Sequence, residues 1–303
     1  MGAARADGGR RRIVTGLAER LVDDGCIRIS GALDPGFCEE VTRSAVSRLG
    51  IREDDPATWP TGTVHLPVEH NWSVDDVAPA AAAAIDEICG GARRVAFAGI
   101  QDNLIVNFPA DPEAWWPPER WDAPTAGWHK DGDWFRHFLD SPEQALLVIV
   151  FWRDVVERQG PTYLAVDSIR GVAELLAAHP EGLDPGAVLA SVPDILRGCR
   201  RFEALTGVQG DIVLCHPFVL HTASVNAAAR WPGSLRCISN TSVMLRHPME
   251  LAADHPTPLE RSVQLALGGR PVRFHATGER GKVVSERELR WKAERDQSAG
   301  SVG

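Results

Sequence analysis

The fold is decided by an apolar stretch in the middle of the chain, Ala145-Leu146-Leu147-Val148-Ile149-Val150-Phe151-Trp152. A half-exposed strand alternates apolar and polar residues, whereas this stretch is apolar on both faces. It therefore predicts a central strand that is covered on each side. Other strands are predicted at residues 26–30, 94–98, 103–108, 163–166, 212–216, 218–221 and 235–245.

Helices are predicted mainly before these strands. Asp34 offers an N-cap oxygen, Pro35 suits the first helical position, and the apolar stripe that follows closes at Gly50. Helical spacing or propensity also predicts helices at residues 13–24, 75–89, 168–178, 186–197 and 286–295. The simplest arrangement is an α+β fold, in which an antiparallel sheet of the two-sheet roll type carries helices on one face.

No internal repeat or break in composition divides the chain. We therefore expect a single domain at residues 13–303, preceded by a mobile tail at 1–12. Within this domain the strand-rich core is expected at about residues 94–245, after an N-terminal helical layer at 13–91 and before a peripheral segment at 246–303.

Composition limits the class of protein. The chain has 303 residues, of which 44% are hydrophobic and 24% charged, and no apolar run approaches the ~20 residues of a membrane span. A net charge of −9 argues against nucleic acid as a partner, because phosphate binding needs clustered Lys and Arg. The start lacks the apolar region of a secretory signal, and six widely spaced Cys fit reduced thiols, which favours the cytoplasm.

The segment His129-Lys130-Asp131 precedes the central stretch and suggests a metal site. If it is extended, His129 and Asp131 point to the same face. A second His from a distant strand would complete a triad of two His and one carboxylate, which binds Fe(II) and leaves other coordination positions open. A surface turn would show the same short pattern, and Asp133 is a rival for the carboxylate.

Several motifs, taken together, give the chain a resemblance to a known family. They are the His-x-Asp pair at 129–131, Gln159-Gly160 with Ser168, Gly210-Asp211, the segment His216-Pro217-Phe218-Val219-Leu220-His221, and Arg236. Over residues 14–245 the sequence resembles the phytanoyl-CoA dioxygenase-like family of Fe(II)- and 2-oxoglutarate-dependent oxygenases. The resemblance implies a double-stranded β-helix, or jelly-roll. It also implies iron ligation by His129, Asp131 and His221, with 2-oxoglutarate and O2 as co-substrates.

The resemblance assigns the 2-oxoglutarate carboxylate to Arg236. The planar guanidinium suits a carboxylate, and a charge directed into a barrel needs such a partner. A surface Arg at a strand end is the alternative, and Arg230 lies in a loop that is longer than is usual for the family. Asn107 and Gln101 could contact 2-oxoglutarate or be satisfied amides.

The expected activity is oxidation, in the first instance hydroxylation, of a small molecule, in secondary metabolism. The substrate pocket is expected between two loops rich in Pro and Trp, at residues 56–73 and 111–125, with contacts from Lys130, Trp134 and His137. The Trp residues could instead only pack the loops. A metal-dependent hydrolase or isomerase and a non-catalytic jelly-roll that binds a small ligand are the competing functions. The sequence indicates no oligomeric state.

Overall fold

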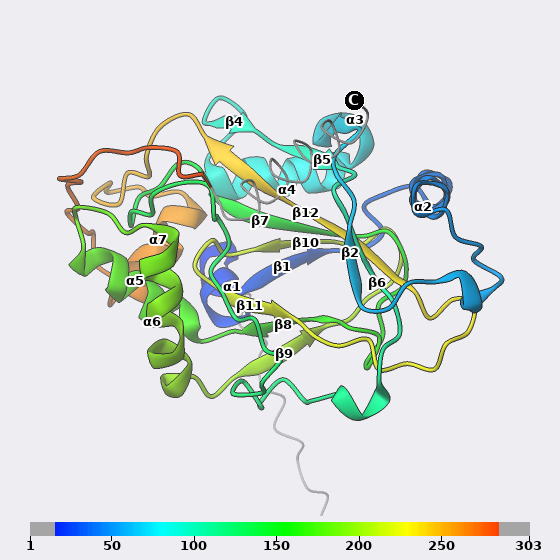
Figure 1. Ribbon diagram of the computed structural model, residues 1–303. Coiled ribbons are helices and arrows are strands. Elements are labelled where there is room, and N and C mark those ends of the chain that lie inside the picture. Colours follow the sequence, from blue (N-terminus) through cyan, green and yellow to red (C-terminus); the bar gives the residue numbers. More distant parts are fainter. Residues whose placement is uncertain (1–15, 285–303) are drawn as a thin grey trace, which may run out of the picture.

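The computed structural model describes residues 16–284 and shows helices packed around antiparallel sheets (Figure 1). The tail expected at residues 1–12 and the helix expected at 286–295 lie outside the described residues. Among the helices within 16–284, none is long and apolar enough to cross a membrane.

The largest sheet has seven strands, and all of its pairings are antiparallel. Its order is β1-β10-β7-β12-β6-β2, with β4 paired to the far end of β12. The strands are β1 (Cys26–Ile29), β2 (Thr63–His65), β4 (Val95–Phe97), β6 (Leu104–Asn107), β7 (Leu146–Phe151), β10 (Ile212–Cys215) and β12 (Arg236–Leu245).

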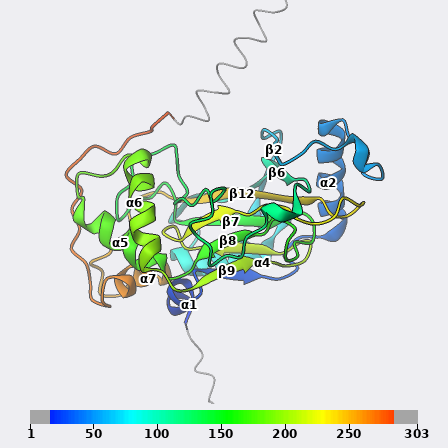
Figure 2. The same ribbon diagram turned by 60° about the horizontal axis from the view of Figure 1, so that its bottom comes forward.

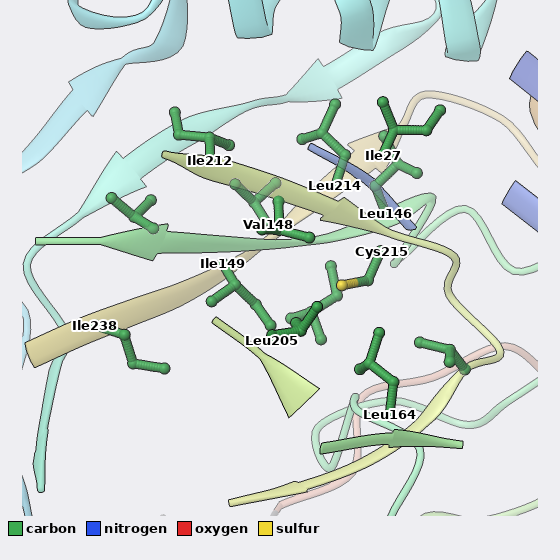
Figure 3. Close-up of a cluster of buried hydrophobic side chains, with 14 of the residues drawn as sticks. Ile27, Leu146, Val148, Ile149, Leu164, Leu205, Ile212, Leu214, Cys215 and Ile238 are labelled. Atoms are coloured by element: carbon green, nitrogen blue, oxygen red, sulfur yellow. The ribbon is translucent and has the colours of Figure 1, made fainter. Parts of the chain in front are cut away.

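Strand β7 confirms the prediction made from the apolar stretch. It is paired on both edges, by β10 and β12, and all six of its residues are buried. Successive side chains point to opposite faces, and Val148 and Ile149 do so in Figure 3. Both faces must therefore be covered, one by helices and the other by a second sheet.

The second sheet consists of β11 (Leu220–Ala223), β8 (Thr162–Ala165) and β9 (Phe202–Leu205), in that order. It lies across from β7, β10 and β12, and the apolar side chains of the two sheets meet between them (Figure 3). Leu164 and Leu205 approach from the second sheet, and Ile149, Cys215 and Ile238 approach from the first. A third pairing joins β3 (Asn71–Ser73) to β5 (Gly99–Gln101).

The helices lie outside the two packed sheets. They are α1 (Leu17–Asp23), α2 (Pro35–Leu49), α3 (Val74–Val77), α4 (Pro79–Cys89), α5 (Ser168–Ala178), α6 (Pro185–Gly198) and α7 (Pro258–Ala266). Helices α5, α6 and α7 cluster at one end and α2 lies at the opposite end, in both views (Figures 1 and 2). The capping prediction for α2 is confirmed, because Asp34 accepts a hydrogen bond from the Phe37 amide and Gly50 has a φ of 63°.

The structure differs from the sequence-based expectation before residue 94. Strands β1, β2 and β3 belong to the sheets, so this part of the chain is not only a helical layer, and residues 56–73 are not wholly irregular. The helix expected at 75–89 is interrupted at Ala78, which precedes Pro79 and has a φ of −145°. Strand β9 and helix α7 were not predicted. The six Cys are free thiols, as expected.

Candidate functional site

Two histidines from distant parts of the chain lie directly opposite each other in a backbone pairing, called the histidine rung below. His129 and His221 form an isolated antiparallel bridge, in which each amide donates to the other's carbonyl at 3.0 Å. The imidazole centroids lie 4.4 Å apart. The side chains of a directly opposed pair project to the same face, so the fold brings together two potential ligands 92 residues apart in the sequence.

Both imidazoles are held with the same nitrogen turned away from the shared space. His129 Nδ1 lies 2.7 Å from the Gly127 carbonyl, and His221 Nδ1 lies 3.3 Å from the Val219 carbonyl. A carbonyl can only accept, so Nδ1 carries the proton and Nε2 keeps its lone pair. Burial, with the nearby His129 as the next cause, lowers the pKa of His221 to about 4. His221 is therefore neutral near pH 7, as a metal ligand must be.

Asp131 completes the group. Ligand atoms of His129, Asp131 and His221 all lie within 4.8 Å of one another, and Asp133 is not part of this set. The backbone turns immediately after Asp131, because Gly132 has a φ of 106°, and a Cβ there would lie 2.4 Å from the Phe135 ring. This turn separates Asp133 from Asp131 and supports the choice of Asp131 as the carboxylate ligand.

Gln144, which the sequence analysis did not single out, positions the Asp131 carboxylate. Its Nε2 donates to Asp131 Oδ2 at 2.8 Å and to Ser242 Oγ at 3.2 Å. Burial raises the pKa of Asp131, but His221, His129 and the Gln144 hydrogen bond act against burial, and the pKa is lowered overall. The available signal was a polar Gln directly before the apolar stretch of β7.

The structure does not place Lys130 and His137 where a substrate contact was expected. Lys130 is 8% exposed, and its Nζ lies 3.0 Å from the Asp131 carbonyl and 3.1 Å from His137 Nδ1. His137 is 1% exposed, and burial, with the charge of Lys130, lowers its pKa to about 2. The neutral Nδ1 of His137 accepts a hydrogen bond from the Lys130 ammonium. Both side chains are buried beside the turn that follows Asp131 and support it.

Arg236 is a buried cation with unused donors. It is 1% exposed, its Nη2 donates to Thr162 Oγ1 at 2.8 Å, and its Nε and Nη1 have no partner among the described residues. Burial lowers the pKa of Arg236 to about 10, which still leaves it charged near pH 7. A desolvated, unpaired charge is costly, so this guanidinium is suited to a bound anion. Arg230, by contrast, donates to four backbone carbonyls, including those of Pro56 and Trp59.

The possible anion site lies beside the histidine rung. Thr162, the partner of Arg236, pairs with Ala223, and Leu164 pairs with His221. Two residues along a strand correspond to about 7 Å. Because His129 and His221 pair in antiparallel fashion, the chain from His129 to Asp131 runs opposite to the chain from His221 to Ala223, and so away from Ala223. Arg236 and Asp131 therefore lie on opposite sides of the two imidazoles.

The two predicted amides fall at opposite ends of this arrangement. Asn107 is the register partner of Arg236, and its Nδ2 donates to the Ser224 carbonyl at 3.1 Å. Gln101 is near Thr241, with 3.5 Å between Oε1 and the hydroxyl, five residues from Arg236 along β12. Asn107 is therefore next to the buried guanidinium, whereas Gln101 is not.

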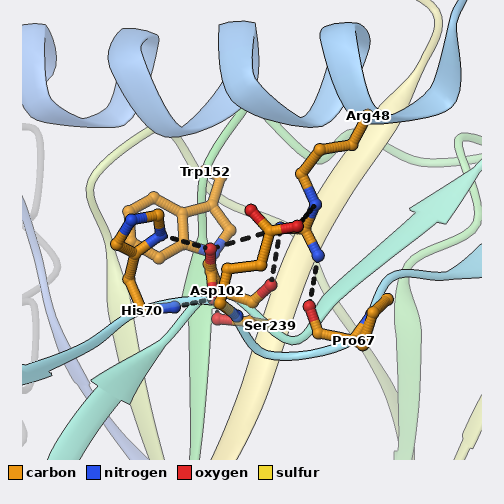
Figure 4. Close-up of polar contacts among 7 residues, drawn as sticks. Arg48, Pro67, His70, Asp102, Trp152 and Ser239 are labelled. Carbon is orange, nitrogen blue, oxygen red and sulfur yellow. Dashed lines mark hydrogen bonds and ion pairs between the residues drawn. The ribbon is translucent and has the colours of Figure 1, made fainter.

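A cleft of about 270 Å³ opens on the Asp131 side. Its lining includes Trp134, together with Gln101 and Asn103. The segment that carries these amides is anchored by Asp102, which is 2% exposed. Asp102 accepts the amides of Glu69 and His70 at 2.7 Å, a ring nitrogen of His70 at 2.9 Å and an Arg48 guanidinium at 3.2 Å (Figure 4).

This network accounts for a second group of potential metal ligands, Glu69, His70 and Asp102. The Asp102 oxygens already accept four hydrogen bonds, so the group is explained as an ion-pair network that ties α2 to the cleft wall.

The two Trp-bearing loops pack onto the sheets. Trp59 is 5% exposed and donates to the Arg52 carbonyl at 2.9 Å, and Trp116 donates to Thr125 Oγ1 at 2.9 Å. No residue of 56–73 or 111–125 lines the cleft beside Asp131. His216 has a structural role, because its ring contacts Ser262 Oγ and accepts a hydrogen bond from the Phe218 amide.

Comparisons with known proteins find likeness in structure and not in sequence. No protein-family model matches the chain, and no curated protein sequence does. One similar structure is the epimerase SnoN in complex with Fe3+, alpha ketoglutarate and nogalamycin RO, with 18% identity, coverage of 89% of this chain and 95% of the other, and a TM-score of 0.46. AviO1 from Streptomyces viridochromogenes has 18% identity, coverage of 77% and 95%, and a TM-score of 0.44.

A third similar structure, EctD from S. alaskensis with 2-oxoglutarate and 5-hydroxyectoine, has 14% identity, coverage of 86% of both chains and a TM-score of 0.40. Two of these structures thus contain the keto acid, and the present chain has a His-Asp-His candidate metal site. Scores and identities this low identify neither a family nor an activity, so function must be inferred from the side chains.

Proposed function

We propose that the protein is an Fe(II)- and 2-oxoglutarate-dependent dioxygenase with a jelly-roll core, which hydroxylates or otherwise oxidises a small molecule of secondary metabolism. The observation that carries this proposal is the order of three groups. The buried Arg236, which has no anionic partner among residues 16–284, lies on one side of the His129–His221 rung, and Asp131 with an open cleft lies on the other.

The side chains fit the ion and the keto acid. His129 and His221 offer Nε2 lone pairs and Asp131 offers an ionised carboxylate, a donor set suited to Fe(II). When bound, the iron supplies the activation of O2 that is coupled to oxidative decarboxylation of 2-oxoglutarate. Arg236 would receive the distal carboxylate, because a guanidinium can bind a carboxylate through two hydrogen bonds and its Nε and Nη1 have no partner among the described residues.

The distances suit a keto acid that reaches from the ligand cluster to Arg236. Thr162, which accepts a hydrogen bond from Arg236, is two residues along β8 from Leu164, the residue opposite His221. This spacing is about 7 Å, which is comparable to the length of a five-carbon dicarboxylate. Gln144 would keep the Asp131 carboxylate in position, since outer hydrogen-bond partners orient metal ligands. The buried Lys130 and His137 exclude water from the other side of Asp131.

A metal-dependent hydrolase is the competing function. The same three ligands could bind Zn(II) and a water molecule, but hydrolysis gives no reason for a buried, unpaired Arg236 beside the site. The deciding experiment incubates the protein with Fe(II), O2 and 2-oxoglutarate and measures succinate, with Zn(II) in a parallel sample. Succinate formation with Fe(II) but not with Zn(II) supports the dioxygenase. Hydrolytic activity with Zn(II) that does not require 2-oxoglutarate would reject the dioxygenase.

A further inference from the structure

The cleft beside Asp131 is lined mainly by neutral hydrogen-bonding groups. Carboxamides come from Gln101, Asn103 and Asn240, and hydroxyls come from Thr241 and Ser242. The cleft is therefore built for a ligand with several hydrogen-bond donors and acceptors, and a long hydrocarbon chain would leave these groups unpaired.

The charge of the cleft has one sign. Asp131 and Asp133 line it, and none of its lining residues within 16–284 is Lys or Arg. Recognition of a phosphate or carboxylate uses Arg, Lys or backbone amides at a helix start. Among the described residues that line the cleft, an anionic group on the substrate would meet no Lys or Arg side chain, which favours an uncharged or cationic ligand.

Asn103 presents an acceptor with no donor. Its Nδ2 donates to the Asn240 carbonyl at 2.6 Å, which fixes the orientation of the amide, and its buried Oδ1 has no partner among the described residues. A buried acceptor without a donor has lost its hydrogen bonds to water and gained none in return, which is a free-energy cost. A ligand hydroxyl or ammonium would remove this cost after a small movement of the amide.

Trp134 adds a flat apolar surface to the same cleft. It is half-buried, its ring centroid is 4.8 Å from that of Phe135, and its backbone carbonyl accepts from the Val283 amide at 2.8 Å. Its position is therefore fixed on both sides. An indole face packs well against the C–H face of a saturated ring, while amides at the rim bind the ring's hydroxyls.

We infer that the substrate is a polyhydroxylated ring without an anionic group, such as a sugar, a cyclitol or an amino-substituted form of either. This inference rests on the proposed function, because it assigns the cleft next to Asp131 to the molecule that is oxidised. It argues against acyl-CoA thioesters, because none of the described residues that line the cleft is a Lys or Arg that could bind their phosphates.

The test uses the protein reconstituted with Fe(II) and 2-oxoglutarate. Under anaerobic conditions, binding of kanamycin, trehalose, glucose 6-phosphate and palmitoyl-CoA is measured by calorimetry. Under air, succinate formation is measured with and without each compound. We expect kanamycin or trehalose to bind and to accelerate succinate formation, and the two anionic compounds to do neither. The inference is overturned if either anionic compound binds more tightly than the polyols, or if neither polyol binds.

Variants locate the binding in this cleft. Gln101→Leu should weaken the bound polyol about 3- to 10-fold, and Trp134→Ala about 10-fold or more. Gln209→Leu is the matched control, because Gln209 lines a separate surface pocket beside Arg43 and Trp231. Fe(II) content and thermal unfolding establish that each variant is folded. Equal polyol affinity in all three variants overturns the assignment of the cleft.

Failure of the inference differs from failure of the proposed function. If the protein converts 2-oxoglutarate to succinate slowly with Fe(II) and no polyol changes the rate, the substrate class is wrong and the dioxygenase stands. If the protein neither binds 2-oxoglutarate nor makes succinate, the proposed function itself is wrong.

Discussion

Replacement of Arg236 by Met should strongly weaken 2-oxoglutarate binding without destabilising the protein. The guanidinium is 1% exposed and has two unpartnered nitrogen atoms, so the folded protein alone gains little from its charge. Replacement of buried ionic groups by apolar ones of similar volume is often neutral or stabilising by about 1–4 kcal/mol. The loss of one side of a desolvated charge pair costs about 2–5 kcal/mol, which corresponds to roughly a 30- to 5,000-fold higher Kd for 2-oxoglutarate.

Two measurements separate these effects. Calorimetric titration of 2-oxoglutarate into Mn(II)-loaded protein gives the Kd, and thermal unfolding with and without 2-oxoglutarate gives the stabilisation. At a ligand concentration of 100 times its Kd, wild-type protein should gain about 2.7 kcal/mol. Arg236→Met should gain less than about 0.9 kcal/mol at the same concentration, because its Kd is at least about 30-fold higher, although its metal content is unchanged.

Arg230→Met is the matched control. Its guanidinium donates to the Pro56 carbonyl at 2.7 Å and the Trp59 carbonyl at 2.9 Å and lies 5.8 Å from the Trp59 ring. This variant should lose stability and keep its affinity for 2-oxoglutarate. The reasoning is refuted if Arg236→Met binds the keto acid within threefold of wild type, or if Arg230→Met shows the binding defect instead.

Three further predictions concern the carboxylates. Asp131→Ala should lose Fe(II) in metal analysis, whereas Asp133→Ala should retain it, because only Asp131 lies with the two imidazoles; the reverse result would show that the wrong carboxylate was chosen. Gln144→Ala should weaken Fe(II) binding about 10- to 100-fold, measured by titration, since it removes the hydrogen bond to Asp131 Oδ2. Unchanged Fe(II) affinity would contradict the role of Gln144 in positioning Asp131. Burial raises the pKa of Asp102, but hydrogen bonds from His70 and others outweigh burial and lower it below 3.8. Its contribution to stability should therefore be complete above pH 4 and fall away in more acidic solution. Asp102→Asn should destabilise by about 1–3 kcal/mol at pH 7 and flatten this dependence in denaturant unfolding; a parallel pH profile would exclude Asp102 as its source.

The sequence predicted the elements whose signals are local. Strand β7 is apolar at every position, and α2 carries its N-cap Asp34 and its closing Gly50 in the sequence itself. The three candidate ligands could be grouped from the sequence because their chemistry is unusual in combination, and the structure places them together. A local signal was overlooked for α7, where Thr257 and Glu260 form a capping box.

Other features depend on tertiary context. Strand β9 is short and mostly only partly buried, so its residues show little pattern, and its pairing with β8 comes from chain segments on either side of α5 and α6. Lys130 and His137 were expected to contact the substrate because they flank the predicted metal-binding segment with polar groups that could orient the substrate. Their burial follows from the turn at Gly132 and from their contact with each other, which no spacing rule reveals.

The shared rung of His129 and His221 limits where the chain can change in length. Side chains on a strand alternate, so a one-residue insertion that shifts either partner would turn one imidazole to the opposite face. Two-residue changes would restore the face but move the ring by about 7 Å. Helices α5 and α6 lie outside the two sheets (Figures 1 and 2), and insertions between residues 184 and 200 leave the rung untouched, because the contacts of Ser168 with the Leu220 amide and of Leu183 with His137 stay in place. Evolution and engineering can therefore lengthen this chain at the helical end, while the spacing around the rung must stay fixed.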